Sequence, residues 1–352
     1  MNYFNKWIIK DIKEIIIDIN KYEKLRNSRI LITGASGMLA TYMIYTLLYL
    51  NDTNEYGIKV IGLVRNKEKA LNRFKEILNR KDFEILVQDV CKELNIEEEI
   101  DYIIHAASQA SPKFITTDPV GIVKANTLGT INVLELARKK KIKNLLFTST
   151  REIYGEVDKD VLSIQENNYG IINPLESRAC YPESKRVAET LCKSYFDQYR
   201  IPFNIVRIAH SYGPGMEINN DGRVMADFIS DTVNYKNIVL KSTGEVERAF
   251  CYISDAVRAM FLVMLDGIRG EAYNIANETE EIAIKDVANL LVTMFPERCM
   301  KVEFNILDSN SNTGYTKVPR VRLNTTKVEN LGWKPQVCLK DGLYRTVKSF
   351  DE

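Results

Sequence analysis

A tyrosine and a lysine four residues apart are the side chains in this sequence whose spacing most directly suggests chemistry. They stand in the stretch Arg178-Ala179-Cys180-Tyr181-Pro182-Glu183-Ser184-Lys185-Arg186. If this stretch opens a helix, residues four apart lie on the same face, one above the other. A lysine ammonium beside a phenol stabilises the phenolate, and so lowers a tyrosine pKa that starts at about 10. Tyr181 is therefore a candidate for moving a proton.

A glycine turn near the start of the chain predicts where a cofactor would lie. The apolar run 29–33 stops at Gly34-Ala35-Ser36-Gly37-Met38-Leu39-Ala40, and a helical pattern follows. Glycines let backbone N–H groups approach a pyrophosphate, and the positive end of the helix dipole faces it. The next strand is expected over 59–64. We therefore predict a dinucleotide site that includes Gly34, Ser36, Gly37 and Met38.

Small or polar residues after the following strands extend this predicted cofactor site. The second strand ends at Arg65, where an acidic residue would bond the adenosine ribose. We predict NAD, but an arginine at this position suits a 2′-phosphate, so NADP stays open. The strands over 83–87 and 101–105 are followed by residues placed to meet the adenine or to let the cofactor lie close. The predicted site beyond the glycine turn comprises Arg65, Asp89, Val90, Ala106, Ala107, Asn126 and Lys185.

The alternation of strands and helices predicts an α/β fold of Rossmann type, a doubly wound parallel sheet. A fifth strand over 144–148 runs into Ser149-Thr150-Arg151-Glu152. Ligands of such sheets bind outside the carboxyl ends of the strands, so Thr150 and Glu152 should project into that crevice. The next helix begins about thirty residues later with Tyr181 and Lys185. We predict that these four residues are catalytic.

A smaller α/β substrate lobe is predicted after the sixth strand, 202–207, where the composition becomes richer in loops. Arginines suit a diphosphate or a carboxylate, although most arginines pair with local carboxylates at the surface. The predicted domains are an N-terminal helical extension (1–28), a dinucleotide-binding domain (29–210, with about 237–257 returning to it) and a substrate lobe (211–236 and 258–352). The residues assigned to substrate binding are Arg151, His210, Arg223, Arg248 and Arg322.

Composition excludes several classes of function. The 352 residues carry a net charge of +1, which gives no support for nucleic acid or an anionic membrane as a partner. Apolar runs such as 43–50 are far shorter than the roughly 20 residues of a membrane-spanning helix. Six scattered cysteines and two histidines offer no metal-site spacing, so no metal is expected. No signal peptide is recognised, and we expect a cytoplasmic protein.

Several motifs in order resemble the extended short-chain dehydrogenase/reductase family, the NAD-dependent epimerases, dehydratases and decarboxylases of nucleotide sugars. The resemblance runs from Ile30 to about Pro335, nearly the whole chain apart from the N-terminal helix. It rests on Thr33-Gly34-Ala35-Ser36-Gly37, Ser149-Thr150 with Tyr154-Gly155, Tyr181-x-x-x-Lys185, Arg207 with Tyr212-Gly213-Pro214, and Leu331-Gly332-Trp333-Lys334-Pro335. It implies NAD or NADP, a nucleotide-diphosphate sugar and a homodimer.

Within that family the chain is most similar to the UDP-glucuronate decarboxylases. The similarity lies in Arg178-Ala179-Cys180-Tyr181, in Asn220-Asp221-Gly222-Arg223-Val224 and in Arg248-Ala249-Phe250. It implies that Tyr181 takes the proton of the sugar C4 hydroxyl while hydride passes to the cofactor, giving a 4-keto sugar. Arg65, Arg151 and His210 depart from the usual pattern. A 4,6-dehydratase, a 4-epimerase and, from another class, a non-catalytic dinucleotide sensor therefore remain alternatives.

Overall fold

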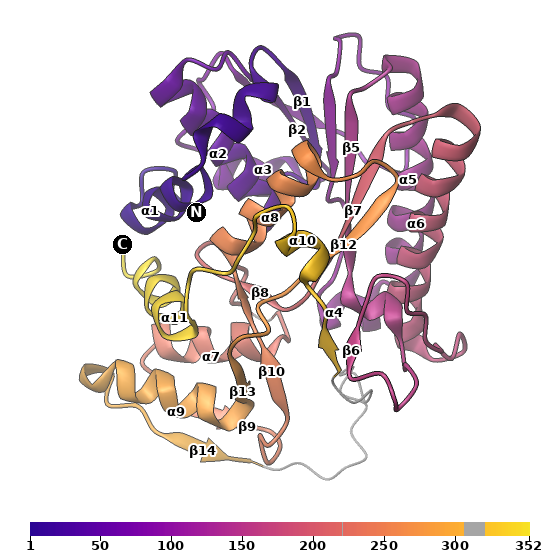
Figure 1. Ribbon diagram of the computed structural model, residues 1–352. Coiled ribbons are helices and arrows are strands. Elements are labelled where there is room, and N and C mark those ends of the chain that lie inside the picture. The colour runs from indigo at the N-terminus through magenta and orange to yellow at the C-terminus, as the bar shows by residue number, and fades with distance from the viewer. Residues whose placement is uncertain (220, 306–320) are drawn as a thin grey trace.

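A seven-stranded parallel sheet forms the centre of the protein. The computed structural model describes residues 1–219, 221–305 and 321–352 (Figure 1). The strand order is β12-β7-β5-β4-β1-β2-β3, and every neighbouring pair is parallel. The strands are β1 (Arg29–Thr33), β2 (Lys59–Val64), β3 (Phe83–Val87), β4 (Tyr102–His105), β5 (Asn144–Thr150), β7 (Phe203–Ile208) and β12 (Glu271–Ile275).

Helices cover both faces of this sheet, because each inner strand is apolar on both sides. In β1, Ile30 and Ile32 pack into one apolar cluster while Leu31, between them, packs into the other. The first cluster includes α2 (Met38–Asn54) and α8 (Ile253–Asp266); the second includes α5 (Pro119–Lys140) and α6 (Cys180–Tyr199). The doubly wound parallel sheet is thus confirmed. Short helices α3 (Lys67–Arg73) and α4 (Pro112–Thr117) lie in the connections.

Paired short strands and three helices form a smaller lobe beside the sheet (Figure 1). The helices are α7 (Val224–Val233), α9 (Ile284–Met294) and α11 (Leu339–Lys348); α10 (Thr326–Glu329) packs on β12. The strand pairs are β9 (Ile238–Leu240) with β14 (Val302–Phe304), β10 (Glu247–Ala249) with β13 (Glu281–Ala283), β8 (Ser211–Tyr212) with β11 (Cys251–Tyr252), and β6 (Ser163–Ile164) with β15 (Arg322–Leu323).

The chain after residue 236 divides its strands between the smaller lobe and the main sheet. The return of about 237–257 to the dinucleotide-binding domain stays a prediction: β9 and β10 pair with β14 and β13 outside the main sheet, while α8 begins at Ile253 and packs in the same apolar cluster as β1. After α8, β12 is the edge strand of the main sheet beside β7. An edge strand with a polar start, Glu271-Ala272-Tyr273-Asn274-Ile275, lacks the continuous apolar run that marks an inner strand.

The N-terminal extension that was predicted to be helical over 1–28 contains two helical elements. These are α1 (Lys6–Ile15) and a 3₁₀ helix (Ile19–Leu25). The Tyr22 hydroxyl donates a hydrogen bond to the carbonyl of Ile15 at 2.9 Å and so satisfies the end of α1. Ile8, Ile12 and Ile15 are buried in the same cluster as α2 and α8. The extension is therefore part of the core.

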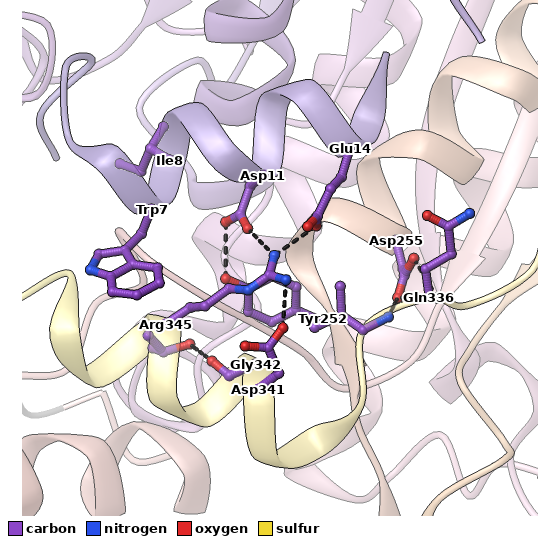
Figure 2. Close-up of polar contacts among 12 residues, drawn as sticks. Trp7, Ile8, Asp11, Glu14, Tyr252, Asp255, Gln336, Asp341, Gly342 and Arg345 are labelled. Carbon is purple, nitrogen blue, oxygen red and sulfur yellow. Dashed lines mark hydrogen bonds and ion pairs between the residues drawn. The ribbon is translucent and has the colours of Figure 1, made fainter. Parts of the chain in front are cut away.

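A buried ionic cluster joins this N-terminal helix to the C-terminal helix. Figure 2 shows Arg345 of α11 between Asp11 and Glu14 of α1 and Asp341 of its own helix. Arg345 Nη1 lies 2.9 Å from Asp11 Oδ1, and the hydroxyl of Tyr252 donates to Asp11 Oδ2 at 2.9 Å. Burial raises the pKa of Asp11 to about 6, although Arg345 opposes the shift. We refer to Asp11, Glu14, Asp341 and Arg345 as the terminal cluster.

The three described ranges lack a helix that could span a membrane and a cluster that could bind a metal. None of their helices is both long and apolar enough to cross a membrane. They contain no group of three or more histidine, cysteine, aspartate or glutamate side chains that could hold a metal ion. All six cysteines are free thiols.

Candidate active site

The turn between β1 and α2 is shaped for close approach by another group. Gly34 has φ of 65°, and a Cβ added there would lie 2.7 Å from the carbonyl oxygen of Ala106. Only glycine accepts both this conformation and this neighbour without strain. Gly37 is the N-cap of α2 and supplies no side-chain cap. The first N–H groups of α2 are therefore available to an anion such as a pyrophosphate.

The other predicted cofactor residues follow the neighbouring strands, at the same edge of the sheet. Arg65 follows β2 and is exposed, while Val90 after β3 is buried. Asp89 Oδ1 accepts a hydrogen bond from the Cys91 N–H at 2.9 Å. Asn126 of α5 donates to Ser184 Oγ at 2.9 Å, and among the described residues its buried Oδ1 has no partner. Together with the glycine turn, this edge fits a dinucleotide.

Tyr181 lies in the first turn of α6, buried beside the end of β5. Burial raises its pKa well above the usual value, and the carboxylate of Glu152 raises it further. A hydrogen bond with the Thr150 side chain lowers the pKa in opposition. The structure thus brings together Tyr181, Thr150 and Glu152, as the sequence predicted. With its pKa raised, Tyr181 stays protonated at neutral pH, and its phenol is a hydrogen-bond donor. It can act as a base only when further positive charge nearby lowers this pKa.

Lys185 lies one turn further along α6, with only 3% of its surface exposed. Its Nζ donates to the backbone carbonyl of Thr148 at 2.7 Å and lies 4.7 Å from the centre of the Phe147 ring. Burial lowers the pKa of Lys185 to about 7. Stabilisation of the Tyr181 phenolate by Lys185 stays a prediction, because the charges that lower the Tyr181 pKa here belong to two arginines, Arg178 and Arg223.

Arg178 is a site residue that our sequence reasoning did not assign a role. Its Nη2 lies 2.7 Å from Glu152 Oε1, and both side chains are partly buried. Its charge also lowers the pKa of Tyr181, three residues later in the chain. The signal was available, because Arg178 opens the stretch that contains Tyr181 and Lys185. The local spacing alone could not show that it would bind Glu152.

Two of the predicted substrate residues lie near this group. Arg223 is the N-cap of α7 and pairs with Asp221, and its charge lowers the pKa of Tyr181. Arg151 directly follows β5 and donates from Nη2 to the carbonyl of Val321 at 3.1 Å. Asn220, in the motif before Arg223, lies outside the described residues. Residues from the smaller lobe therefore reach the end of β5, where Tyr181 is.

The remaining predicted substrate residues have nearer partners. Arg322 is largely exposed and forms an ion pair with Glu281 at 2.8 Å. Arg248, on the strand paired with that of Glu281, donates to the carbonyl of Glu247. His210 has φ of 35°, and its ring lies 6.0 Å from that of Phe250. Substrate binding by Arg248, Arg322 and His210 stays a prediction.

Comparison with known proteins identifies the family. The model of the NAD dependent epimerase/dehydratase family matches residues 30–276. The chain belongs to this family. UDP-glucuronic acid decarboxylase 6 of Arabidopsis thaliana is 33% identical over 317 residues, which are 90% of this chain and 87% of the relative. UDP-glucuronic acid decarboxylase 1 of Xenopus tropicalis is 33% identical over 322 residues, 92% of this chain and 72% of the relative. The predicted resemblance is confirmed.

Solved structures of family members share the fold. The UDP-glucose 4-epimerase of Thermotoga maritima, with UDP-glucose, has a TM-score of 0.77 at 24% identity and covers 92% of this chain and 98% of its own. The UDP-glucuronic acid 4-epimerase of Bacillus cereus, in complex with UDP-glucuronic acid and NAD, has a TM-score of 0.76 at 23% identity, covering 92% and 99%. As a member of the NAD dependent epimerase/dehydratase family with decarboxylase relatives, this protein is an enzyme of nucleotide-sugar chemistry.

Proposed function

We propose that this enzyme oxidises C4 of a nucleotide sugar and that its substrate is UDP-glucuronate, which it decarboxylates. One observation carries the proposal: Tyr181, Thr150 and Glu152 meet at the end of β5, and the charges of two arginines act on the same phenol. The decarboxylase relatives at 33% identity support the substrate. Arg178 and Arg223 are paired with Glu152 and Asp221, and each guanidinium can also donate hydrogen bonds to the carboxylate of an anionic sugar.

Each residue of the site has a defined part in the proposed oxidation. Tyr181 takes the proton of the C4 hydroxyl, and Thr150 orients the same oxygen by a hydrogen bond. NAD, when bound, accepts the hydride from C4. The glycine turn at Gly34 and Gly37 holds the pyrophosphate, and Lys185 holds the nicotinamide ribose. Because the ketone forms beta to the carboxylate of a glucuronate, it can receive the electron pair released as carbon dioxide leaves.

The same first step serves two other reactions. The site favours a 4,6-dehydratase less, because that reaction needs a proton donor where this chain has Arg151, and a guanidinium keeps its proton and is a poor donor. A 4-epimerase stays an alternative, because it needs only Tyr181, Thr150 and room for the ketone to rotate. Glu152, paired with Arg178, would position the sugar in the decarboxylase and is the candidate base at C5 in a dehydratase.

Incubation of the protein with UDP-glucuronate, dTDP-glucose, and GDP- and CDP-sugars separates these outcomes. Mass spectrometry distinguishes loss of carbon dioxide, loss of water and an unchanged mass, and chromatography then resolves epimers. We expect loss of carbon dioxide from UDP-glucuronate. Tyr181→Phe should lower the rate at least a hundredfold with folding unchanged, in line with the usual range of general acid–base effects of about 10²–10⁴. Absence of turnover on every sugar would eliminate the proposed function.

A non-catalytic dinucleotide sensor is the alternative from another class. Retention of Tyr181, Lys185 and Thr150 at one place argues against it, because a sensor needs none of them to hold a dinucleotide. Absorbance in the reduced-nicotinamide band, followed as substrate is added to protein with its bound cofactor, discriminates the two. A sensor would bind the nucleotide and give no change in that band.

The choice between NAD and NADP depends on Arg65. We propose NAD, because the family and the structural relative with bound NAD use it. The exposed guanidinium of Arg65 at the end of β2 would nevertheless suit a 2′-phosphate. Identifying the nucleotide released from denatured, purified protein decides the matter. Release of NADP alone would reassign the cofactor.

We also propose that the enzyme is a cytoplasmic homodimer. Apolar side chains are exposed along α5 and α6, which pack on each other: Val120, Val123 and Leu128 on the first and Val187 and Tyr199 on the second. A second copy could cover them. Six free thiols suit a reducing compartment. Light scattering should give twice the chain mass, and Leu128→Glu should shift it towards the monomer.

A further inference from the structure

Glu189 is a largely buried carboxylate on α6 to which the proposed chemistry assigns no role. It follows Lys185 by four residues, as Lys185 follows Tyr181, so the three side chains occupy successive turns of one helix face. Its side chain is only 12% exposed. Arg207 of β7 binds the carboxylate at both oxygens, with Nε 3.2 Å from Oε1 and Nη2 2.7 Å from Oε2. The carboxylate is therefore fixed in one position.

The end of β5 contacts all three turns of this helix face. The carbonyl of Thr148 accepts from Lys185 Nζ, the hydroxyl of Ser149 donates to Glu189, and the side chain of Thr150 bonds Tyr181. Three consecutive strand residues thus hold the proton-transfer tyrosine, the lysine and the carboxylate. Glu189 is therefore held by the same strand end as Tyr181 and Lys185, although it lies one helical turn beyond Lys185.

Among the described residues, three titratable groups besides Tyr181 interact electrostatically with Lys185. Cys192 and Glu189 lie on its own helix, and His105 lies on β4. Burial raises the pKa of the Cys192 thiol, and burial with the Lys185 charge lowers the pKa of His105 to about 3, so both are neutral at neutral pH. Thr33 and Thr130 bond the two ring nitrogens of His105. Of the three, Glu189 alone brings charge.

Arg207 is the remaining charged group in this neighbourhood, and its guanidinium is fully engaged. Besides Glu189, it donates from Nη1 to the hydroxyl of Tyr154 at 2.9 Å and to the carbonyl of Glu166 at 2.7 Å. It is buried as well. Arg207 therefore fixes the position of the Glu189 carboxylate and offsets the cost of burying its charge. Glu189 in turn raises the pKa of Lys185, which burial lowers.

We propose that Glu189, anchored by Arg207 and Ser149, is a positioning residue that keeps Lys185 protonated and aligned at the end of β5. The ammonium is the form that can donate to ribose hydroxyls and favour a phenolate at Tyr181. Burial already lowers the pKa of Lys185 to about 7, and without the carboxylate of Glu189 the pKa would fall further, so the ammonium would be lost at lower pH. That Lys185 serves the cofactor rests on the proposed function; the charge relation between Glu189 and Lys185 does not.

The direct test is a titration of Lys185 itself, in protein without nucleotide or sugar. Lysine labelled with ¹³C at Cε reports protonation by NMR, and Lys185→Arg assigns the signal by its loss. We expect Glu189→Gln to move the titration of Lys185 to lower pH by at least about half a pH unit. Glu189→Asp, which keeps the charge, should restore most of the wild-type value.

Glu183→Gln is the matched control, because Glu183 is a more exposed carboxylate on the same helix and pairs with Arg186. It should leave the titration of Lys185 unchanged. Should Glu189→Gln not fold, the double variant Glu189→Gln/Arg207→Gln leaves no uncompensated guanidinium and should give the same displacement. An unchanged titration of Lys185 in Glu189→Gln, or an equal displacement in Glu183→Gln, would overturn the proposal.

Nucleotide binding supplies a second readout that does not need turnover. NAD affinity measured by calorimetry should weaken between about pH 6 and about pH 8 more steeply in Glu189→Gln than in wild type, because the ammonium is lost earlier. Parallel pH dependences in the two proteins would contradict the assigned role. A protein that turns over no nucleotide sugar would lose the proposed function, yet the titration would still decide the role of Glu189.

Discussion

Replacing Arg345 by methionine tests the terminal cluster, because it removes the only cation described there and keeps a similar volume. The Arg345 side chain is 4% exposed and Asp11 is fully buried, whereas Glu14 and Asp341 keep access to water. After Arg345→Met the hydroxyls of Tyr42 and Tyr252 still donate to Asp11, at 2.7 and 2.9 Å. The change therefore leaves one carboxylate buried with hydrogen bonds but without a counter-charge.

The expected loss of stability can be worked out from these contacts. Two unit charges about 4 Å apart attract by roughly 4 kcal/mol at an effective dielectric constant of about 20. Removing one partner of a buried pair costs about 3–5 kcal/mol, because the other charge stays desolvated. Water can stabilise Glu14 and Asp341, so Asp11 dominates the cost. We expect the free energy of unfolding to fall by about 3–5 kcal/mol at about pH 7.5.

The same variant should regain stability on acidification. The pKa of Asp11 is already raised to about 6 in the folded protein, and loss of Arg345 raises it further. A carboxyl whose folded pKa exceeds its unfolded value favours the folded state at low pH and loses that contribution as the pH rises through the folded pKa. Each pH unit is worth about 1.4 kcal/mol. The deficit relative to wild type should therefore shrink between about pH 7.5 and about pH 5.5.

Urea unfolding followed by the fluorescence of Trp7 and Trp333 measures both effects. Arg26→Met is the matched control, because Arg26 and Glu23 form an exposed pair at 2.6 Å, 42% and 51% exposed. Exposed pairs contribute little, so its unfolding midpoint should stay close to that of wild type. A loss in Arg345→Met no larger than in Arg26→Met, or a loss independent of pH, would refute the reasoning.

Two further predictions concern the active site. Gly34→Ala should weaken NAD binding at least about tenfold, because its Cβ would lie 2.7 Å from the carbonyl oxygen of Ala106; Gly222→Ala is the control, with φ of 86° but no neighbour nearer than 3.8 Å. Equal effects of the two changes on NAD affinity would show that the backbone conformation alone matters. Arg178→Gln should move the rising limb of the pH–rate profile for UDP-glucuronate to higher pH, because a charge that lowers the pKa of Tyr181 is gone. Arg178→Lys should keep the wild-type limb, and a limb unmoved in both variants would remove Arg178 from the proton transfer.

The inner strands of the sheet could be predicted from the sequence, because each buried parallel strand is a short continuous run of apolar residues. The strand predicted over 59–64 is β2, and the one predicted over 144–148 extends two residues further in β5, to Thr150. Returning segments were harder to place, since short strands such as β9 and β12 carry the same few apolar residues whichever sheet they join. Their partners are set by packing over long sequence separations, which local patterns do not contain.

The site was predictable to the extent that its residues follow strands or share a helix face. Thr150 and Tyr181 meet because the end of β5 and the start of α6 lie at the same edge of the sheet. The order of strands and helices along the chain already implies this arrangement. Arg178 and Glu189 were not predicted as site residues. Their roles depend on ion pairs with Glu152 and Arg207, which lie elsewhere in the sequence. The likeness to known decarboxylases added the substrate class, which neither the spacing nor the electrostatics of this chain specifies alone.

The terminal cluster also bears on the order in which the chain can assemble. Asp11 and Arg345 are 334 residues apart, so during synthesis the carboxylate leaves the ribosome long before its guanidinium exists. Until then, burying Asp11 would leave a charge without its partner, which favours a solvated N-terminal helix. Docking of α1 on the core is therefore less favourable until the C-terminal helix has been made, although its apolar side chains can pack earlier.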